Sequence, residues 1–429
     1  MDLVKCSALI MAFQSNRQHS SFSLGVNEPS ENLSNQVIFH FDRSKFNLKR
    51  IDISFSRCRE INEDTFRYFT ALEELLMDEN QIKSINENAF QDLTNLRHLF
   101  VCKNKLEQLD NPKTFSYLTN LNQFLAKSNQ IKYINPLVFS SFVNLEKLDL
   151  SFNKIERLER GTFENLTHLK ELNLEQNKLI EIDCDLFNGL RRLEKLAISK
   201  NQLSILIKGT FRDLVALREL RLNDNSIRFI EDGTFCEMSS LEKLNLNANK
   251  LEKIGGEQLF RGLGSLEQLQ LRQNKLTHLD EASFVNLTRL QRLELGENCL
   301  ERLSERTFES LVMLRELFLD ANRLRELDLI LLFKYLKCLE ELTLNSNQLE
   351  RVIFLNRKQL YRRSCCMEED DVVERRFQNL LSLKKIDLEN NHPNLHENIS
   401  KLENLKLLSS SELTPIEKCI IRRKLLGYN

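Results

Sequence analysis

The sequence predicts a curved α/β solenoid, a horseshoe with a parallel β-sheet on its concave face and short helical or irregular segments on its convex side. Three observations predict it: Leu-x-x-Leu starts recur at steps of 24 or 25 residues, an Asn follows the strand in thirteen of the fourteen units, and a Phe stands further along thirteen of them. Only the last step is longer, at 44 residues. The starts are Leu48, Leu72, Leu96, Leu121, Leu145, Leu169, Leu193, Leu217, Leu241, Leu266, Leu290, Leu314, Leu339 and Leu383.

Each start opens a short strand. The alternation Leu148-Asp-Leu150 is typical, and it places leucines on one face of the strand and variable residues on the other. Parallel stacking of the strands then buries the leucine face. Strands lie about 4.8 Å apart, whereas the opposite side of each unit needs more room, so the array bends with its sheet inside.

The recurring Asn and Phe have separate structural roles. Stacked carboxamides can satisfy buried backbone groups where a carboxylate would be costly, and one phenyl ring per unit predicts a spine behind the sheet. In the first unit Ser56 stands where Asn is expected. The ladder members are Asn80, Asn104, Asn129, Asn153, Asn177, Asn201, Asn225, Asn249, Asn274, Asn298, Asn322, Asn347 and Asn391, and the spine members are Phe66, Phe90, Phe115, Phe139, Phe163, Phe187, Phe211, Phe235, Phe260, Phe284, Phe308, Phe333 and Phe377.

The unit resembles the typical class of leucine-rich repeats in animal extracellular proteins such as Slit, chaoptin, connectin, Toll-type ectodomains and the acid-labile subunit. The likeness covers about residues 48–396. It implies ligand binding or cell adhesion at the cell surface or outside the cell, without catalysis. Neither end carries the clustered cysteines that commonly cap such proteins, so an intracellular, cytoplasmic scaffold or regulatory subunit is the alternative.

The segments around the array are expected to differ from it. Residues 1–36 are polar and are predicted to be disordered or a leader, with only a weak signal peptide near Leu3–Phe13. Residues 37–47 should supply a cap strand. The array, 48–396, contains a charged loop insert at 356–378, and residues 397–429 should form a C-terminal cap.

Composition argues against several classes of function. Lys plus Arg (61) balances Asp plus Glu (62), so no global field favours nucleic acid. No apolar run reaches the length of a membrane span. No Cys/His spacing suggests a metal, and no phosphate loop or nucleophile paired with a base appears. We therefore expect that the chain is not an enzyme and has no cofactor or metal site. Its expected partner is a protein ligand or receptor.

The variable strand residues point to one binding surface. Units two to four carry Leu76, Phe100 and Leu125 where later units carry Asp149 and Asn173. We expect these apolar groups to form an outward patch for a protein partner, together with His98 and Phe152, and Phe318 is a weaker, isolated candidate. A folded-back N-terminal segment or self-association into a homodimer would also bury the patch.

Two other surface patterns are explained without a binding function. The middle units alternate charges, as in Glu146-Lys147 beside Lys170-Glu171, which favours strand register and solubility over binding. Glycosylation motifs of the form Asn-x-Ser/Thr fit a secreted chain but also arise by chance. Their asparagines are Asn32, Asn165, Asn286 and Asn398.

Overall fold

The computed structural model describes residues 21–23, 48–63, 65–304, 306–328, 332, 334–353, 383–393 and 395. These residues fall into two compact units, Met1–Leu217 and Arg218–Asn429, and each is described separately. The expected cap strand at 37–47, the insert at 356–378 and the C-terminal cap at 397–429 lie outside the described residues. Phe333 and Phe377 of the expected spine do so as well.

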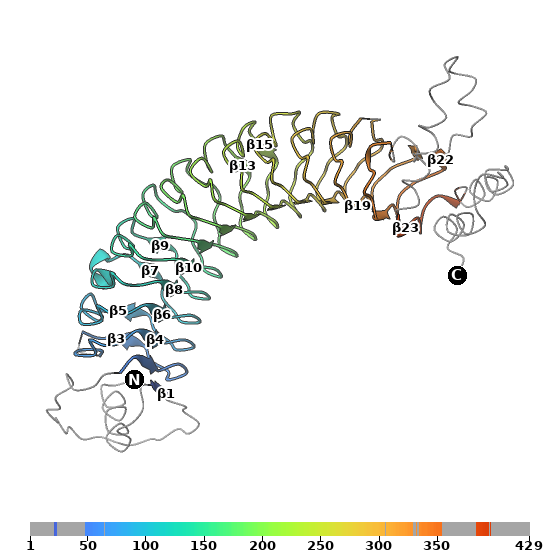
Figure 1. Cartoon of the computed structure of the whole chain (residues 1–429). Coiled ribbons are helices and arrows are strands. Elements are labelled where there is room, and N and C mark those ends of the chain that lie inside the picture. The colour runs from blue at the N-terminus through green and yellow to red at the C-terminus, as the bar shows by residue number, and fades with distance from the viewer. Residues whose placement is uncertain are drawn as a thin grey trace, which may run out of the picture. The chain divides into compact units, whose positions relative to one another are not determined.

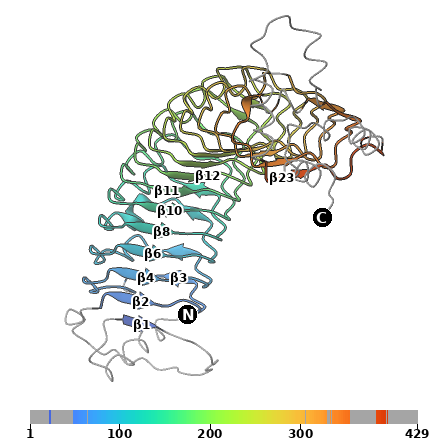
Figure 2. The same cartoon turned by 45° about the vertical axis from the view of Figure 1, so that its right-hand side comes forward.

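Parallel strands from successive repeats form the main sheet of both units (Figure 1), and every Leu-x-x-Leu start is followed two residues later by one of these strands. In the first unit the sheet runs through β1 (Ser21–Ser23), β2 (Arg50–Asp52), β4 (Glu74–Leu76), β6 (His98–Phe100), β8 (Gln123–Leu125), β10 (Lys147–Asp149), β11 (Glu171–Asn173) and β12 (Lys195–Ala197) (Figure 2). In the second unit it runs through β14 (Glu219–Arg221), β16 (Lys243–Asn245), β17 (Gln268–Gln270), β18 (Arg292–Glu294), β19 (Glu316–Phe318), β21 (Glu341–Thr343) and β23 (Lys385–Asp387). The predicted parallel solenoid is confirmed.

The segments behind the main sheet are mostly turns. Short strand pairs join neighbouring repeats there: β3 (Glu60–Ile61) with β5 (Ser84–Ile85), β7 (Gln108–Leu109) with β9 (Tyr133–Ile134), and β20 (Glu326–Asp328) with β22 (Arg351–Ile353). β13 (Ile205–Leu206) and β15 (Phe229–Ile230) are of the same kind. A 3-10 helix, η2 (Pro112–Phe115), begins after its cap Asn111. Of the two expectations, helical or irregular, the described convex segments follow the irregular one almost throughout.

Most of the described repeats bury a central strand leucine and a spine Phe. Leu148 and Leu172 are paired in register, and both are essentially inaccessible to solvent. The spine rings Phe139, Phe163 and Phe187 stack nearly parallel, with centroids 6.4 Å apart at each step. Equivalent atoms in the sheet are only about 4.8 Å apart. Within a unit the coil therefore bends with the sheet on its concave side.

The Asn ladder clamps each repeat to its neighbour. The Oδ1 of Asn153 accepts a hydrogen bond from the Ile131 backbone N–H at 3.0 Å, and its Nδ2 donates to the carbonyls of Ala126 (3.1 Å) and Leu150 (3.0 Å). Ala126 and Ile131 belong to the preceding repeat. The amide thus satisfies buried backbone groups of two repeats at once, which confirms the predicted role. A carboxylate there could accept hydrogen bonds but could not donate to the carbonyls.

The edge strand beside the first repeat comes from the segment that was expected to be a leader. β1 pairs with β2 in parallel, with Phe22 opposite Ile51. Three residues of 1–36 therefore extend the main sheet. This pairing gives the first repeat a neighbour on its N-terminal side, as the nearest-neighbour stability of a solenoid requires.

Candidate protein-binding surface

The outward-facing strand residues form two rows across the sheet. The first and third residues of each strand face away from the buried leucine, and we call the line of third residues the third row. From β2 to β12 this row crosses seven strands in register. Its members are Asp52, Leu76, Phe100, Leu125, Asp149, Asn173 and Ala197.

Leu76, Phe100 and Leu125 lie side by side in this row and form what we call the apolar stripe. All three side chains are half-buried, the same degree of burial as Asp149 and Asn173 in the same row. Any side chain at this position of the strand is therefore partly buried, and no other segment of the described chain needs to cover the three apolar residues. The structure places the predicted residues together, and the His98 ring stacks parallel to that of Phe100 at 6.2 Å.

The polar residues of the third row have a structural duty that the sequence analysis missed. Asp149 Oδ1 accepts a hydrogen bond from the Ser151 N–H at 2.9 Å, and Asn173 Oδ1 accepts one from the Glu175 N–H at 3.0 Å. The same cap of the strand-end turn recurs at Asp52, Asn245 and Asp387. Its signal was available in the sequence, because Asp or Asn recurs between two aliphatic residues at the end of these strands.

The stripe residues cannot form this cap, because leucine and phenylalanine have no acceptor. Each of them therefore forgoes a local hydrogen bond that contributes about 0.5–1.5 kcal/mol elsewhere in the row. At Phe100 the turn is capped differently: Asp78 Oδ1, from the preceding repeat, accepts from the Cys102 N–H at 2.6 Å. The repeats of Leu76 and Leu125 thus give up this cap for apolar surface, whereas the repeat of Phe100 replaces it with a contact from the preceding repeat.

Asp78 and Cys102 form a partly buried polar edge beside the stripe. Burial is the main cause that raises the pKa of Asp78, and it raises that of the Cys102 thiol to about 12. The Cys102 Sγ contacts the Leu125 carbonyl oxygen at 3.5 Å. The thiol is therefore protonated at neutral pH and acts as packing rather than as a nucleophile.

Phe152 lies on the turn after β10 rather than on the strand. It occupies the left-handed backbone position that precedes the ladder Asn in each repeat (φ 56°), and the Lys127 Nζ lies 4.8 Å from its ring centroid. Phe55, at the equivalent position of the first repeat, is 61% exposed. Phe152 thus borders the apolar stripe from the turn side.

Phe318 belongs to the second unit and stands alone. Its third-row neighbours are Glu294 and Thr343, and the Arg292 guanidinium lies 4.5 Å from its ring centroid. Arg292 also forms ion pairs with Glu294 and Glu316. A single ring covered by a paired cation offers much less apolar surface than the stripe does.

The strands that follow the stripe carry paired charges. The Nζ atoms of Lys147 and Lys195 each lie 2.9 Å from an oxygen of Glu171, and Lys170 pairs with Glu146 at 3.0 Å. Hydrogen bonds from Lys195 and then Lys147 are the largest causes that lower the pKa of Glu171. These contacts join adjacent strands, as the alternating charges predict.

The described glycosylation motifs differ in their surroundings. Asn165 is exposed, whereas the Nδ2 of Asn286 donates to the Glu257 carbonyl at 2.7 Å. A glycan on Asn286 would use the nitrogen that makes this bond. Asn32 and Asn398 lie outside the described residues.

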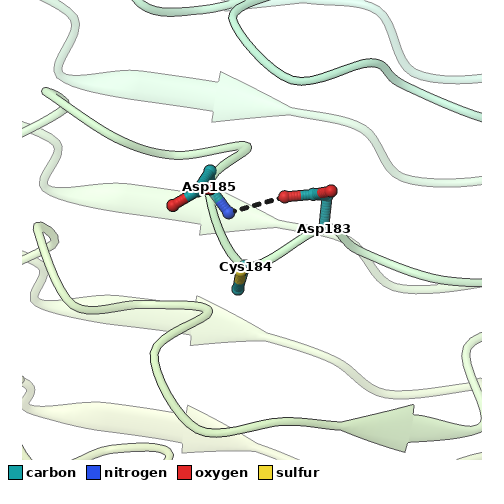
Figure 3. A group of neighbouring side chains, drawn as sticks. All are labelled: Asp183, Cys184 and Asp185. Carbon is teal, nitrogen blue, oxygen red and sulfur yellow. Dashed lines mark hydrogen bonds between the residues drawn. The ribbon is translucent and has the colours of Figure 1, made fainter.

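The one cluster among the described residues with metal-ligand spacing is Asp183, Cys184 and Asp185. Asp183 Oδ1 accepts a hydrogen bond from the Asp185 N–H at 2.8 Å (Figure 3). The Asp185 carboxylate lies 2.6 Å from Arg160 and 2.8 Å from Arg212, which belong to the preceding and the following repeat. A metal cation would have to displace both arginines. The ion pairs of Asp185 therefore connect three successive repeats.

A second amide ladder was also missed in the sequence analysis. In the turns that lead into the strands, Asn95 Nδ2 donates to the Thr70 carbonyl, Asn120 Nδ2 to that of Thr94, and Asn144 Nδ2 to that of Thr119, at 2.8–2.9 Å. The signal was an Asn directly before the start leucine in three successive repeats. This ladder joins the turns that lead into β6, β8 and β10 to those of the preceding repeats.

Comparisons with known proteins agree with this architecture. The chain is similar to a leucine-rich-repeat protein of Leptospira interrogans (25% identity, TM-score 0.66, 83% of this chain and 82% of that one). It is also similar to a chain of the Toll–Spätzle complex of Drosophila (23%, 0.70, 90% and 49%) and to one of the LRIM1/APL1C complex (19%, 0.64, 95% and 76%). The last two likenesses show the fold alone.

No curated protein matches this chain in sequence. In the described part of the chain, no helix combines the length and apolar character needed to cross a membrane.

The family assignment follows from the sequence model of the leucine rich repeat. This model matches residues 46–106, 95–155, 143–203, 167–227, 191–251, 216–276 and 264–324. Together the matches span 46–324, well over half of the 429 residues. The chain belongs to the leucine-rich-repeat family.

Proposed function

We propose that this chain is a non-catalytic protein-binding module of the extracellular type, and that it binds its partner on the strand face through the apolar stripe. One observation carries the proposal: Leu76, Phe100 and Leu125 replace capping residues on three adjacent strands. Solvent-facing apolar groups that forgo a hydrogen bond need a compensating gain, and burial by a partner supplies one.

Several findings support the wider parts of this proposal. Two similar structures are chains of protein complexes, namely the Toll–Spätzle and LRIM1/APL1C assemblies. The repeat unit resembles that of extracellular proteins, and Asn165 is an exposed acceptor in a glycosylation motif. His98, Phe152 and Lys127 border the stripe, and they would form the rim of the interface.

The test replaces one stripe residue by the amide that the same row uses elsewhere. Leu125→Asn should lower affinity for the partner at least about tenfold, since a buried apolar contact is lost. Ala197→Asn introduces the same side chain in the same row, four strands from β6, and should leave binding intact. Cell-surface and secreted proteins retained by the immobilised chain provide the readout. A partner that both variants retain equally would contradict the proposal.

The second candidate is an intracellular scaffold or regulatory subunit. Five cysteines among the described residues are free thiols, which suits a reducing compartment: Cys58, Cys102, Cys184, Cys299 and Cys338. The two candidates differ in the glycan. Mass spectrometry of chain from its native source should find a glycan on Asn165 if it is extracellular, and an unmodified Asn165 with reduced thiols if it is not.

A further inference from the structure

The apolar stripe is framed by carboxylates that form no ion pair among the described residues. Asp52 and Asp149 end the stripe within the third row, and Asp78 lies beside it on the turn after β4. An acidic group of the same strands is paired, because Glu74 of β4 forms an ion pair with Arg50 of β2. The three carboxylates, which we call the acidic frame, therefore leave negative charge around an apolar centre.

The cation on the turn after β8 lies over an aromatic ring. Lys127 places its Nζ over Phe152, at 4.8 Å from the centroid, and forms no ion pair among the described residues. The first-row cations at the two ends are already paired, Arg50 with Glu74 and Lys147 with Glu171. Among the described residues, the end carboxylates of the frame thus have no ion-pair partner of their own.

The spacing of the stripe favours one partner conformation. Its three residues span two strand separations, about 9.6 Å. Apolar residues at positions i, i+4 and i+7 of an α-helix span about 10.5 Å, whereas alternate residues of an extended strand span about 13 Å. Only the helix matches within about 1 Å. Asp52 and Asp149 are about 19 Å apart on the same scale, so each faces roughly one helical turn beyond the apolar positions.

We infer that the stripe binds an amphipathic helix of a partner protein, with three apolar residues on one face and a basic residue one turn beyond each end. This inference rests on the proposed function and specifies the partner's chemistry. The apolar residues cover the stripe, and the two basic residues pair with Asp52 and Asp149. Each carboxylate keeps its Oδ1 on the turn N–H, and its second oxygen receives the partner's cation.

Two synthetic peptides test the inference on the full chain. Both are helical and carry leucine at i, i+4 and i+7; one has lysine at i−4 and i+11, and the other has glutamate there. Fluorescence anisotropy should show the lysine peptide bound about tenfold more tightly, because two ion pairs replace two like-charge contacts. The preference should shrink as salt is added.

Matched variants locate the preference on the frame. Asp52→Asn with Asp149→Asn keeps both turn caps, as Asn173 and Asn245 do naturally, and should reduce the preference to about twofold or less. Asp387→Asn removes a third-row carboxylate of the second unit and should preserve it. Leu125→Asn should weaken both peptides.

Three results would overturn the inference: equal affinity for the two peptides, no binding of either, or an undiminished preference in the Asp52/Asp149 double variant. A concentration-dependent dimer in sedimentation that Leu125→Asn abolishes would also overturn it, by making a second copy the occupant. The proposed function fails separately, if the native partner still binds Leu125→Asn. If Leu125→Asn loses the partner but the lysine peptide does not compete with it, only the inference fails.

Discussion

Strands β4, β6 and β8 pair in the same parallel sheet and register as β10, β11 and β12, yet their outward residues have different roles. The later strands use theirs to hold the solenoid together: Asp149 caps its turn, and Glu171 bridges two lysines. The earlier strands place leucine and phenylalanine at the same positions of the third row. A solenoid can exchange stabilising contacts for binding surface in one stretch because its buried layers continue unchanged beneath it.

Loss of a ladder amide should have the largest effect on the free energy of unfolding, and it tests the buried layer that the two regions have in common. Asn129→Ala, beneath the stripe region, and Asn177→Ala, beneath the charged region, each remove an acceptor for one buried N–H and a donor to two carbonyls. Both should lower the free energy of unfolding by about 3 kcal/mol or more, measured by urea denaturation. A clear inequality between the two would show that the regions differ in their core as well.

A reciprocal exchange in the third row should have a smaller effect. Leu125→Asn gains a cap for its turn while losing partial burial, so its stability should change by less than about 1 kcal/mol. Asp149→Leu loses the bond to the Ser151 N–H and should destabilise by about 1 kcal/mol. Thermal melting checks both. Strong destabilisation by Leu125→Asn would mean that the stripe is part of the core.

The pH dependence of Asp78 should reveal the cost of burying charge beside the stripe. Because burial holds its pKa above the ordinary value, the folded chain binds this proton more tightly than the unfolded chain, and stability falls as pH rises through the raised pKa. Asp78→Asn keeps the acceptor for Cys102 without titrating. Its melting temperature should exceed that of the wild type at pH 7, and the gain should vanish below pH about 4. A gain independent of pH would contradict this.

Glu171 should show the opposite sign and the smallest effect. Its lysine partners hold its pKa below the ordinary value, so its contribution is present at neutral pH and is lost as pH falls through the lowered pKa. Glu171→Gln should cost no more than about 1 kcal/mol at pH 7 in low salt, and less in high salt. Melting curves at pH 7 and pH 3 measure the difference. A cost that persists at pH 3 would assign Glu171 a role other than ion pairing.

The sequence predicted most of the fold because the repeats are compared with one another within a single chain. Recurrence made the strand leucines, the ladder Asn and the spine Phe visible, and the described residues confirm each of them. Features that occur in only a few repeats were harder to find. The caps at Asp149 and Asn173 looked like ordinary surface variation, and β1 had no repeat motif that could identify it.

The candidate site was predicted in part for the same reason. Alignment of repeats placed Leu76, Phe100 and Leu125 in one row, which the strand register confirms. The acidic frame was not predicted, because a carboxylate without a partner is defined by its surroundings in three dimensions. Asp78, for example, reaches the Cys102 N–H of the next repeat, a contact between residues 24 positions apart.

Hydrogen–deuterium exchange of the full chain with and without its captured partner tests the central claim most directly. Binding on the stripe should slow exchange at residues 76–78, 100–102 and 125–127 on the strands and turns that carry it. Residues 173–175, at the equivalent place on β11, should exchange at an unchanged rate. Protection confined to β11 and β12, or to the turns behind the sheet, would contradict the account.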